Sequence, residues 1–151
     1  MINIFNDDFR DFIGCFNKHN VEYILVGGMA VILNGYIRTT GDMDVWVKKT
    51  PGNYKAIVTA FYEFGMPVFD MVEEKFLDDK FDVWSFGRDP ARIDLMTEVK
   101  GLDFDEVYEI AQYYTEEGVT FRFLHMNSLI AAKRASGRYR DLDDIEQLGK
   151  K

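Results

Sequence analysis

One stretch of the sequence, Tyr23–Val47, constrains the fold more than any other. It begins with an apolar run, breaks at Gly27-Gly28, and ends with Asp42 and Asp44 inside a second apolar run. Carboxylates are poor strand formers and are costly to bury unless something compensates their charge. Because sequences tend to break such local rules at functional sites, we look for a site here first.

Helical and strand patterns alternate along the chain. We expect helices over residues 7–19, 29–33, 51–64, 70–77, 104–111, 127–136 and 142–148, and strands over 21–26, 43–47, 81–86, 92–96 and 119–124. The strands at 81–86 and 92–96 are separated by a turn sequence, which is typical of a hairpin. This order predicts an α+β or mixed α/β fold, in which helices flank a short twisted mixed sheet.

Composition limits the class of protein. A length of 151 residues is usual for one domain, so we expect a single domain over residues 1–151, and 47% apolar residues suffice for its core. The one cysteine cannot form an internal disulfide, which favours a reducing compartment. The N-terminal residues show no signal-peptide pattern, and no apolar run approaches the roughly 20 residues that span a bilayer. We therefore expect a cytoplasmic protein without membrane contact.

The net charge of −8 limits the binding partners. It argues against a broad basic face, so we do not expect extended nucleic-acid binding. An acidic chain can still bind a polyphosphate, provided that metal ions or a local cluster of Lys and Arg compensate the charge.

Three carboxylates fall in strand-like sequence. Asp42 and Asp44 lie two residues apart, so they project from the same face, with Cα atoms about 6–7 Å apart. They repel each other unless a cation lies between them, and such oxygen ligands suit Mg²⁺ or Mn²⁺. Asp94 is set in a second apolar strand. If the two strands are neighbours, the cluster can hold two metal ions and support phosphoryl or nucleotidyl transfer.

The Asp-x-Asp pattern is weakly specific by itself, because surface strands also carry it. Gly27-Gly28 adds to it, since glycines at the end of a strand let the backbone approach a ligand and the following helix offers N–H groups to phosphate. The alternative for the glycines is an ordinary tight turn between strand and helix. The two features together are more specific than either one.

Basic residues near the carboxylates and in the C-terminal tail are candidate phosphate contacts. Arg38, with Thr40, precedes Asp42, and it either pairs with the carboxylates, contacts a phosphate or is a solvated loop residue. Lys133 and Arg138 belong to the densest basic cluster of the chain. They either neutralise a triphosphate or pair with the acidic residues that follow them.

Gly27-Gly28, thirteen intervening residues and Asp42-Met43-Asp44-Val45 together resemble the signature of the DNA polymerase β-type nucleotidyltransferase superfamily. Asp94 falls where that superfamily places its third carboxylate. The tail over residues 133–145 is similar to the C-terminal signature of small stand-alone bacterial nucleotidyltransferase-like proteins. These include the toxins of abortive-infection and toxin–antitoxin systems.

The resemblance implies a site and a reaction. Gly27 and Gly28 would cradle the triphosphate, Asp42 and Asp44 would bind Mg²⁺ or Mn²⁺, and Asp94 would help to hold the catalytic metal and activate a hydroxyl group. The substrate would be a nucleoside triphosphate such as ATP, and the products a nucleotidylated acceptor and pyrophosphate. Arg38, Thr40, Lys133 and Arg138 are assigned as further nucleotide contacts.

Two other functions compete with this hypothesis. The chain could be a nucleotidyltransferase-like binding or regulatory protein without transferase activity, such as a toxin–antitoxin component. The Asp-x-Asp pattern also occurs as the metal motif of glycosyltransferases, but that hypothesis leaves Gly27-Gly28 and Asp94 unexplained. The sequence does not specify the acceptor, and a partner protein is expected to complete its binding site or to regulate it.

Overall fold

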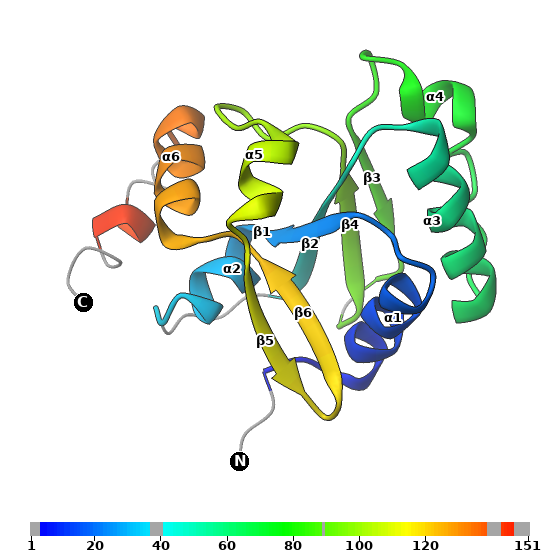
Figure 1. The fold of residues 1–151 in the computed structure, drawn as a ribbon, viewed down its shortest axis with the longest axis horizontal. Coiled ribbons are helices and arrows are strands. Elements are labelled where there is room, and N and C mark those ends of the chain that lie inside the picture. Colours follow the sequence, from blue (N-terminus) through cyan, green and yellow to red (C-terminus); the bar gives the residue numbers. More distant parts are fainter. Residues whose placement is uncertain (1–3, 37–40, 89, 139–142, 147–151) are drawn as a thin grey trace.

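A six-stranded mixed sheet forms the centre of the fold (Figure 1). The computed structural model describes residues 4–36, 41–88, 90–138 and 143–146. The strands are β1 (Tyr23–Val26), β2 (Asp42–Val47), β3 (Val83–Phe86), β4 (Arg92–Met96), β5 (Gln112–Glu116) and β6 (Val119–Phe123). Their order is β3-β4-β2-β1-β6-β5, with β2 parallel to β4, β1 parallel to β6 and the other neighbours antiparallel. The predicted mixed sheet with flanking helices is confirmed.

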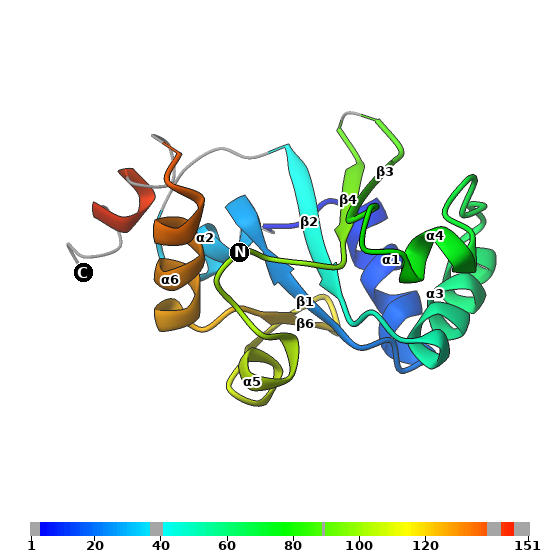
Figure 2. The ribbon, with the colours of Figure 1, turned by 90° about the horizontal axis from the view of Figure 1, so that it is seen from above.

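Helices cover both sides of this sheet (Figures 1 and 2). They are α1 (Asp7–Lys18), α2 (Gly27–Leu33), α3 (Pro51–Phe64), α4 (Glu73–Leu77), α5 (Phe104–Glu109) and α6 (Met126–Ser136). The helices α1, α3 and α4 gather on one side, α5 and α6 lie on the other, and α2 follows β1 at the end near α6. Every helix of the described residues falls short of the length or the apolar character needed to cross a bilayer.

The helix limits follow from local capping signals. The Asn6 side chain accepts a hydrogen bond of 2.8 Å from the Phe9 N–H at the start of α1. Thr50 does the same for the Asn53 N–H at the start of α3, over 3.1 Å. Gly65 ends α3 with a φ of +92°, in the left-handed region that glycine adopts without strain.

The two faces of the central strands meet different surroundings. Met43 and Val45 are fully buried in the larger core, against α1 and α3. Trp46 and Ile24 point the other way, into a smaller core shared with α5 and α6. Asp44 lies between Met43 and Val45 on β2 and points to the opposite face, that of the smaller core. The predicted alternation along this strand is therefore confirmed.

The predicted elements missed β5. The segment Gln112–Glu116 pairs with β6 as a hairpin, with Glu116 opposite Val119. Its two-residue turn, Glu117-Gly118, has positive φ at both positions (50° and 78°), as a type I′ turn requires. Such turns usually contain Asn-Gly or Asp-Gly, whereas glutamate rarely adopts a positive φ. The sequence Glu117-Gly118 therefore did not indicate a hairpin.

Some helix limits differ from the prediction, and the last predicted helix is described only in part. The helix after β1 begins at Gly27 rather than at residue 29, and α4 is shorter than the predicted 70–77. Of the last predicted helix, 142–148, only residues 143–146 belong to the described part of the chain, and they are helical.

A buried carboxylate ties the N-terminal segment to the β5–β6 hairpin. Glu116 accepts hydrogen bonds from the Ile4 and Phe5 N–H groups and pairs with Arg10 over 2.9 Å. Burial by itself raises the pKa of Glu116, but these hydrogen bonds outweigh it and lower the pKa below its usual value. The carboxylate therefore stabilises the fold at pH values above its unfolded pKa, and this contribution is lost as the pH falls through the folded pKa.

We predict that Glu116→Gln lowers the free energy of unfolding by about 3 kcal/mol at pH 7, because Arg10 loses its buried partner and keeps only the exposed Asp7 carboxylate. The difference from the unmodified chain should shrink as the pH falls through the folded pKa of Glu116, which lies below the usual value. Urea unfolding across this pH range measures both effects. The exposed neighbour serves as control, since Glu117→Gln should change stability by less than about 0.5 kcal/mol. Equal losses in both variants at every pH would contradict the prediction.

Candidate functional site

A cleft of about 700 Å³ opens where β1 ends, between the sheet and α6. Seven of the nine candidate site residues line it: Gly27, Gly28, Asp42, Asp44, Asp94, Lys133 and Arg138. The other two, Arg38 and Thr40, lie outside the described residues. Residues far apart in the sequence thus meet around one space, which is of a size typical for small-molecule sites.

The parallel pairing of β2 with β4 brings the carboxylates together. In its register, Asp44 is directly opposite Asp94, and Asp42 is opposite Arg92. Partners on adjacent strands lie about 5 Å apart and point to the same face. On the other side of β2, Asp44 is opposite Val26, the residue that precedes Gly27. Asp44 is therefore central in the site.

Gly27 has to be a glycine for two reasons. Its φ of +63° is a conformation that other residues adopt only with strain. A Cβ atom on Gly27 would also collide with the Oδ2 and Cγ atoms of Asp44. The bare backbone at this position thus leaves room for the Asp44 carboxylate and for whatever approaches it.

The environment of Asp44 is unfavourable for a negative charge. Burial, followed by the charges of Asp94 and Asp42, raises its pKa to about 6, although the positive charges of Lys133 and Arg138 oppose the shift. A carboxylate in such surroundings gains more from a nearby cation than an exposed one does.

Two residues that the sequence did not mark hold the carboxylates of this site. The Ser85 hydroxyl donates a hydrogen bond of 2.6 Å to Asp94 Oδ1. The Arg92 Nε lies 3.3 Å from the same oxygen and 3.9 Å from Asp42 Oδ2. Arg92 thus compensates part of the charge on two neighbouring strands. Arg92 lies two residues before Asp94, on the same face of β4, and this spacing was the signal that the sequence offered. The role of Ser85 depends on the β3–β4 register instead.

The carboxylates are not arranged as a ready-made metal cage. Within the described ranges, no group of three or more His, Cys, Asp and Glu residues is close enough to hold a metal ion as it stands. Asp42 and Asp94 interact with Arg92 instead.

Lys133 reaches the cleft from α6 in a buried ion pair. Its Nζ lies 3.1 Å from Asp144 Oδ2, and the two side chains are only 7% and 2% exposed. Asp144 comes from the helical residues 143–146, beyond the end of α6 at Gly137. The C-terminal segment thus fixes a cation beside the carboxylates, and Arg138, which is exposed, adds a second positive charge.

Comparison with known proteins identifies a family and a similar fold. A family model described as "Nucleotidyltransferase of unknown function (DUF6036)" matches residues 12–149. The fold is similar to the crystal structure of a candidate nucleotidyltransferase, TM1012 from Thermotoga maritima, with a TM-score of 0.59 and 12% sequence identity. The similarity covers 95% of this chain and 91% of that one. A search of curated proteins found no match.

The raised pKa of Asp44 predicts how the site affects stability. Because the folded protein binds the proton more tightly than the unfolded chain, the free energy of unfolding should fall as the pH rises from about 4 to about 6, and stay lower above that. Asp44→Asn removes this loss, so without divalent cations it should be more stable than the unmodified chain by about 2–3 kcal/mol at pH 8. Near pH 4 the difference should vanish.

Thermal and urea unfolding in EDTA at both pH values measure this difference. Asp70→Asn is the matched control, because Asp70 is exposed and does not line the cleft. A pH profile of Asp44→Asn identical to that of the unmodified chain would show that Asp44 carries no unfavourable charge.

Proposed function

The chain belongs to the family of nucleotidyltransferases of unknown function, DUF6036, and from this premise we propose that it transfers a nucleoside monophosphate group from a nucleoside triphosphate, such as ATP, to a hydroxyl acceptor. Pyrophosphate is the second product. One observation carries the proposal: Asp44 and Asp94 lie opposite each other on β2 and β4, beside the bare backbone of Gly27 and in one cleft with basic side chains that include Lys133 and Arg138.

The donor set fits Mg²⁺ or Mn²⁺. Asp42, Asp44 and Asp94 supply hard oxygen ligands from one face of the sheet. The pKa of Asp44 is raised by burial and by the two other carboxylates, so a bound cation would stabilise its charged form. When bound, such ions neutralise the charge that develops on the transferred phosphoryl group. Arg92 compensates the same carboxylates when no ion is present.

The basic wall of the cleft binds the triphosphate. Lys133 and Arg138 line the same cleft as the carboxylates, and their positive charges oppose the rise in the pKa of Asp44. In a site shielded from water, such charges stabilise phosphate oxygens strongly. Gly27 and Gly28 let the phosphates approach the main chain, where no side chain stands in the way. Arg38 and Thr40 are proposed as further contacts to the nucleotide.

Asp94 is proposed to activate the acceptor. It accepts the proton of the acceptor hydroxyl while the oxygen of that group forms a bond to the α-phosphorus. The bond from the α-phosphorus to the bridging oxygen breaks at the same time, and pyrophosphate leaves with that electron pair. The Ser85 hydroxyl, 2.6 Å from Asp94 Oδ1, orients the carboxylate for this role.

A second candidate function is nucleotide binding without transfer, as in a regulatory toxin–antitoxin component. The observation that favours it is the position of Arg92, which contacts Asp42 and Asp94, two of the carboxylates that would bind the metal ion. In both hypotheses we place the chain in the cytoplasm, as one domain, with a partner protein that completes or regulates the acceptor site.

We predict that the chain binds ATP in the presence of Mg²⁺ and transfers the labelled α-phosphate to an acceptor. Asp44→Asn and Asp94→Asn should each lower single-turnover transfer by at least about 100-fold, because Asp44→Asn removes a proposed metal ligand and Asp94→Asn removes the proposed proton acceptor. Asp70→Asn is the matched control, since Asp70 is exposed and does not line the cleft. Binding without transfer would support the second candidate, and no binding of any nucleoside triphosphate would refute both.

We predict that Asp144 positions Lys133. Asp144→Asn should raise the KM for the triphosphate about tenfold or more and change kcat less, because the Lys133 ammonium loses the partner that orients it. Asp143→Asn is the matched control from the same turn, where Asp143 is exposed. Equal KM values for the two variants would assign the ion pair to the fold alone, and nucleotide-binding isotherms would check this without turnover.

A further inference from the structure

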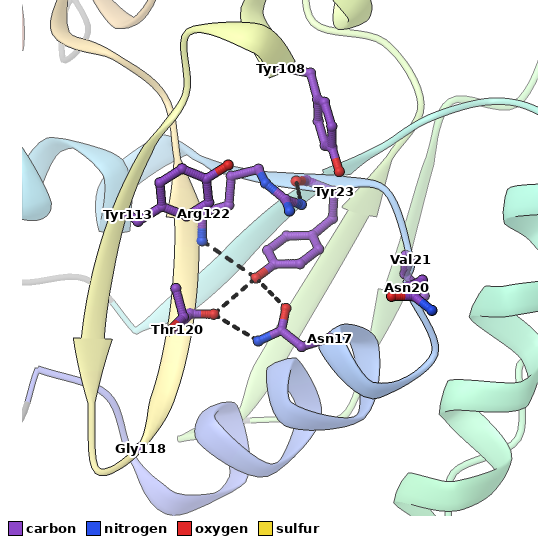
Figure 3. A pocket seen from close by; sticks show the side chains of 9 residues that line it. All are labelled: Asn17, Asn20, Val21, Tyr23, Tyr108, Tyr113, Gly118, Thr120 and Arg122. Atoms are coloured by element: carbon purple, nitrogen blue, oxygen red, sulfur yellow. Dashed lines mark hydrogen bonds between the residues drawn. The ribbon is translucent and has the colours of Figure 1, made fainter.

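A second cavity, of about 420 Å³, lies at the other end of β1 from the cleft (Figure 3). It is bounded by the end of α1, the start of β1, helix α5 and the β5–β6 hairpin. Strand β5 of this hairpin is the element that sequence analysis missed. The proposed transfer reaction uses none of the residues around this cavity.

Arg122 is the only described charged residue that lines the cavity, and aromatic rings surround it. Its guanidinium carbon lies 4.4 Å from the ring centre of Tyr108, 5.1 Å from that of Tyr23 and 5.6 Å from that of Tyr113. Its Nη1 donates a hydrogen bond of 3.1 Å to the Tyr23 carbonyl. Figure 3 shows the guanidinium among these rings. The cation is thus held in one orientation before any ligand arrives.

No described carboxylate lies within ion-pair distance of this guanidinium, in contrast to Arg10 and Arg92. Its Nε is buried and has no hydrogen-bond acceptor among the described residues. The phenols supply no negative charge either, because burial raises the pKa of Tyr23 to about 12 and also raises that of Tyr108. Among the described residues, the positive charge is therefore compensated by ring faces, one carbonyl and a hydrogen bond with the Tyr108 side chain, without a carboxylate in ion-pair distance.

This compensation is incomplete. A cation–π contact is attractive, but it offers the guanidinium no hydrogen-bond acceptor. Leaving a buried donor unpaired is unfavourable, and more so when the group is charged. A ligand with a negative oxygen removes this cost and gains charge-assisted hydrogen bonds.

Neighbouring groups complete a small polar pocket. The Tyr23 hydroxyl donates to Asn17 Oδ1 over 2.9 Å, and the Asn17 amide donates to the Thr120 carbonyl over 2.7 Å, so the floor is fixed. The Tyr113 side chain, on a residue that is 61% exposed, forms the rim. The volume is at the lower end of the range for small-molecule sites.

We propose that this cavity binds the oxyanion of a small molecule, either a carboxylate or a phosphate group, with Arg122 as its anchor. The cavity and the cleft are separate sites, because they share no lining residue. Arg122 gives the cavity a positive charge, whereas three aspartates give the cleft a negative one. We therefore expect metal–nucleotide complexes to bind in the cleft and metal-free anions to bind in the cavity.

The test is an NMR titration of the protein that follows the Nε–Hε signal of Arg122, assigned through bonds in the unmodified chain. Inorganic phosphate and acetate are added separately, and sodium chloride at matched ionic strength serves as the third arm. A saturable shift with phosphate or with acetate, absent with chloride, supports the proposal and shows which oxyanion is bound. Shifts that are equal in all three arms, or do not saturate, overturn it.

Calorimetry with the favoured anion gives the second measurement. Arg122→Gln should weaken binding at least tenfold, Arg122→Lys should weaken it less because the charge remains, and Arg134→Gln should have no effect. Arg134 is exposed on α6 and does not line the cavity, so it is the matched control. Equal binding by Arg122→Gln and the unmodified chain would exclude this cavity. The NMR result stands by itself if the Arg122 variants fold poorly.

Discussion

Repulsion between Asp44 and Asp94 is the constraint on which the site depends. The parallel β2–β4 pairing forces the two carboxylates into adjacent positions, and the Asp44 carboxylate lies against the backbone of Gly27. Nearby positive charges reduce this repulsion in part. They come from Arg92 on β4, Lys133 on α6 and Arg138 beyond the end of α6. The fold therefore maintains an arrangement that is unfavourable by itself and that a bound cation would relieve.

The sequence was sufficient where the signal was local. Strand alternation placed Asp42 and Asp44 on one face, and capping residues such as Asn6 and Thr50 marked the helix starts. The approach of Asp94 to Asp44 depended on the pairing of β2 with β4, which no local pattern states; the structure shows that pairing. The family resemblance is confirmed by the family model, whereas the roles of the site residues stay predictions.

Other features lay outside the reach of local patterns. The contact of Ser85 with Asp94 follows from a cross-strand register, and the Lys133–Asp144 pair bridges two segments on either side of a helix end. Strand β5 was missed because its turn contains a glutamate at positive φ, a conformation that the surrounding hairpin imposes. In each case a tertiary contact overrides the preference of the single residue.

The topology also sets an order of events during biosynthesis. The central strand β1 pairs with β6 in a register that joins Leu25 to Phe123, about 100 residues apart. A ribosome therefore releases β1 long before its parallel neighbour exists, and contacts of such separation form slowly. The wall that carries Lys133 is translated later still. Chains that end before α6 hold two acidic strands without the basic half of the cleft, so premature termination yields a product that lacks the basic wall of the site.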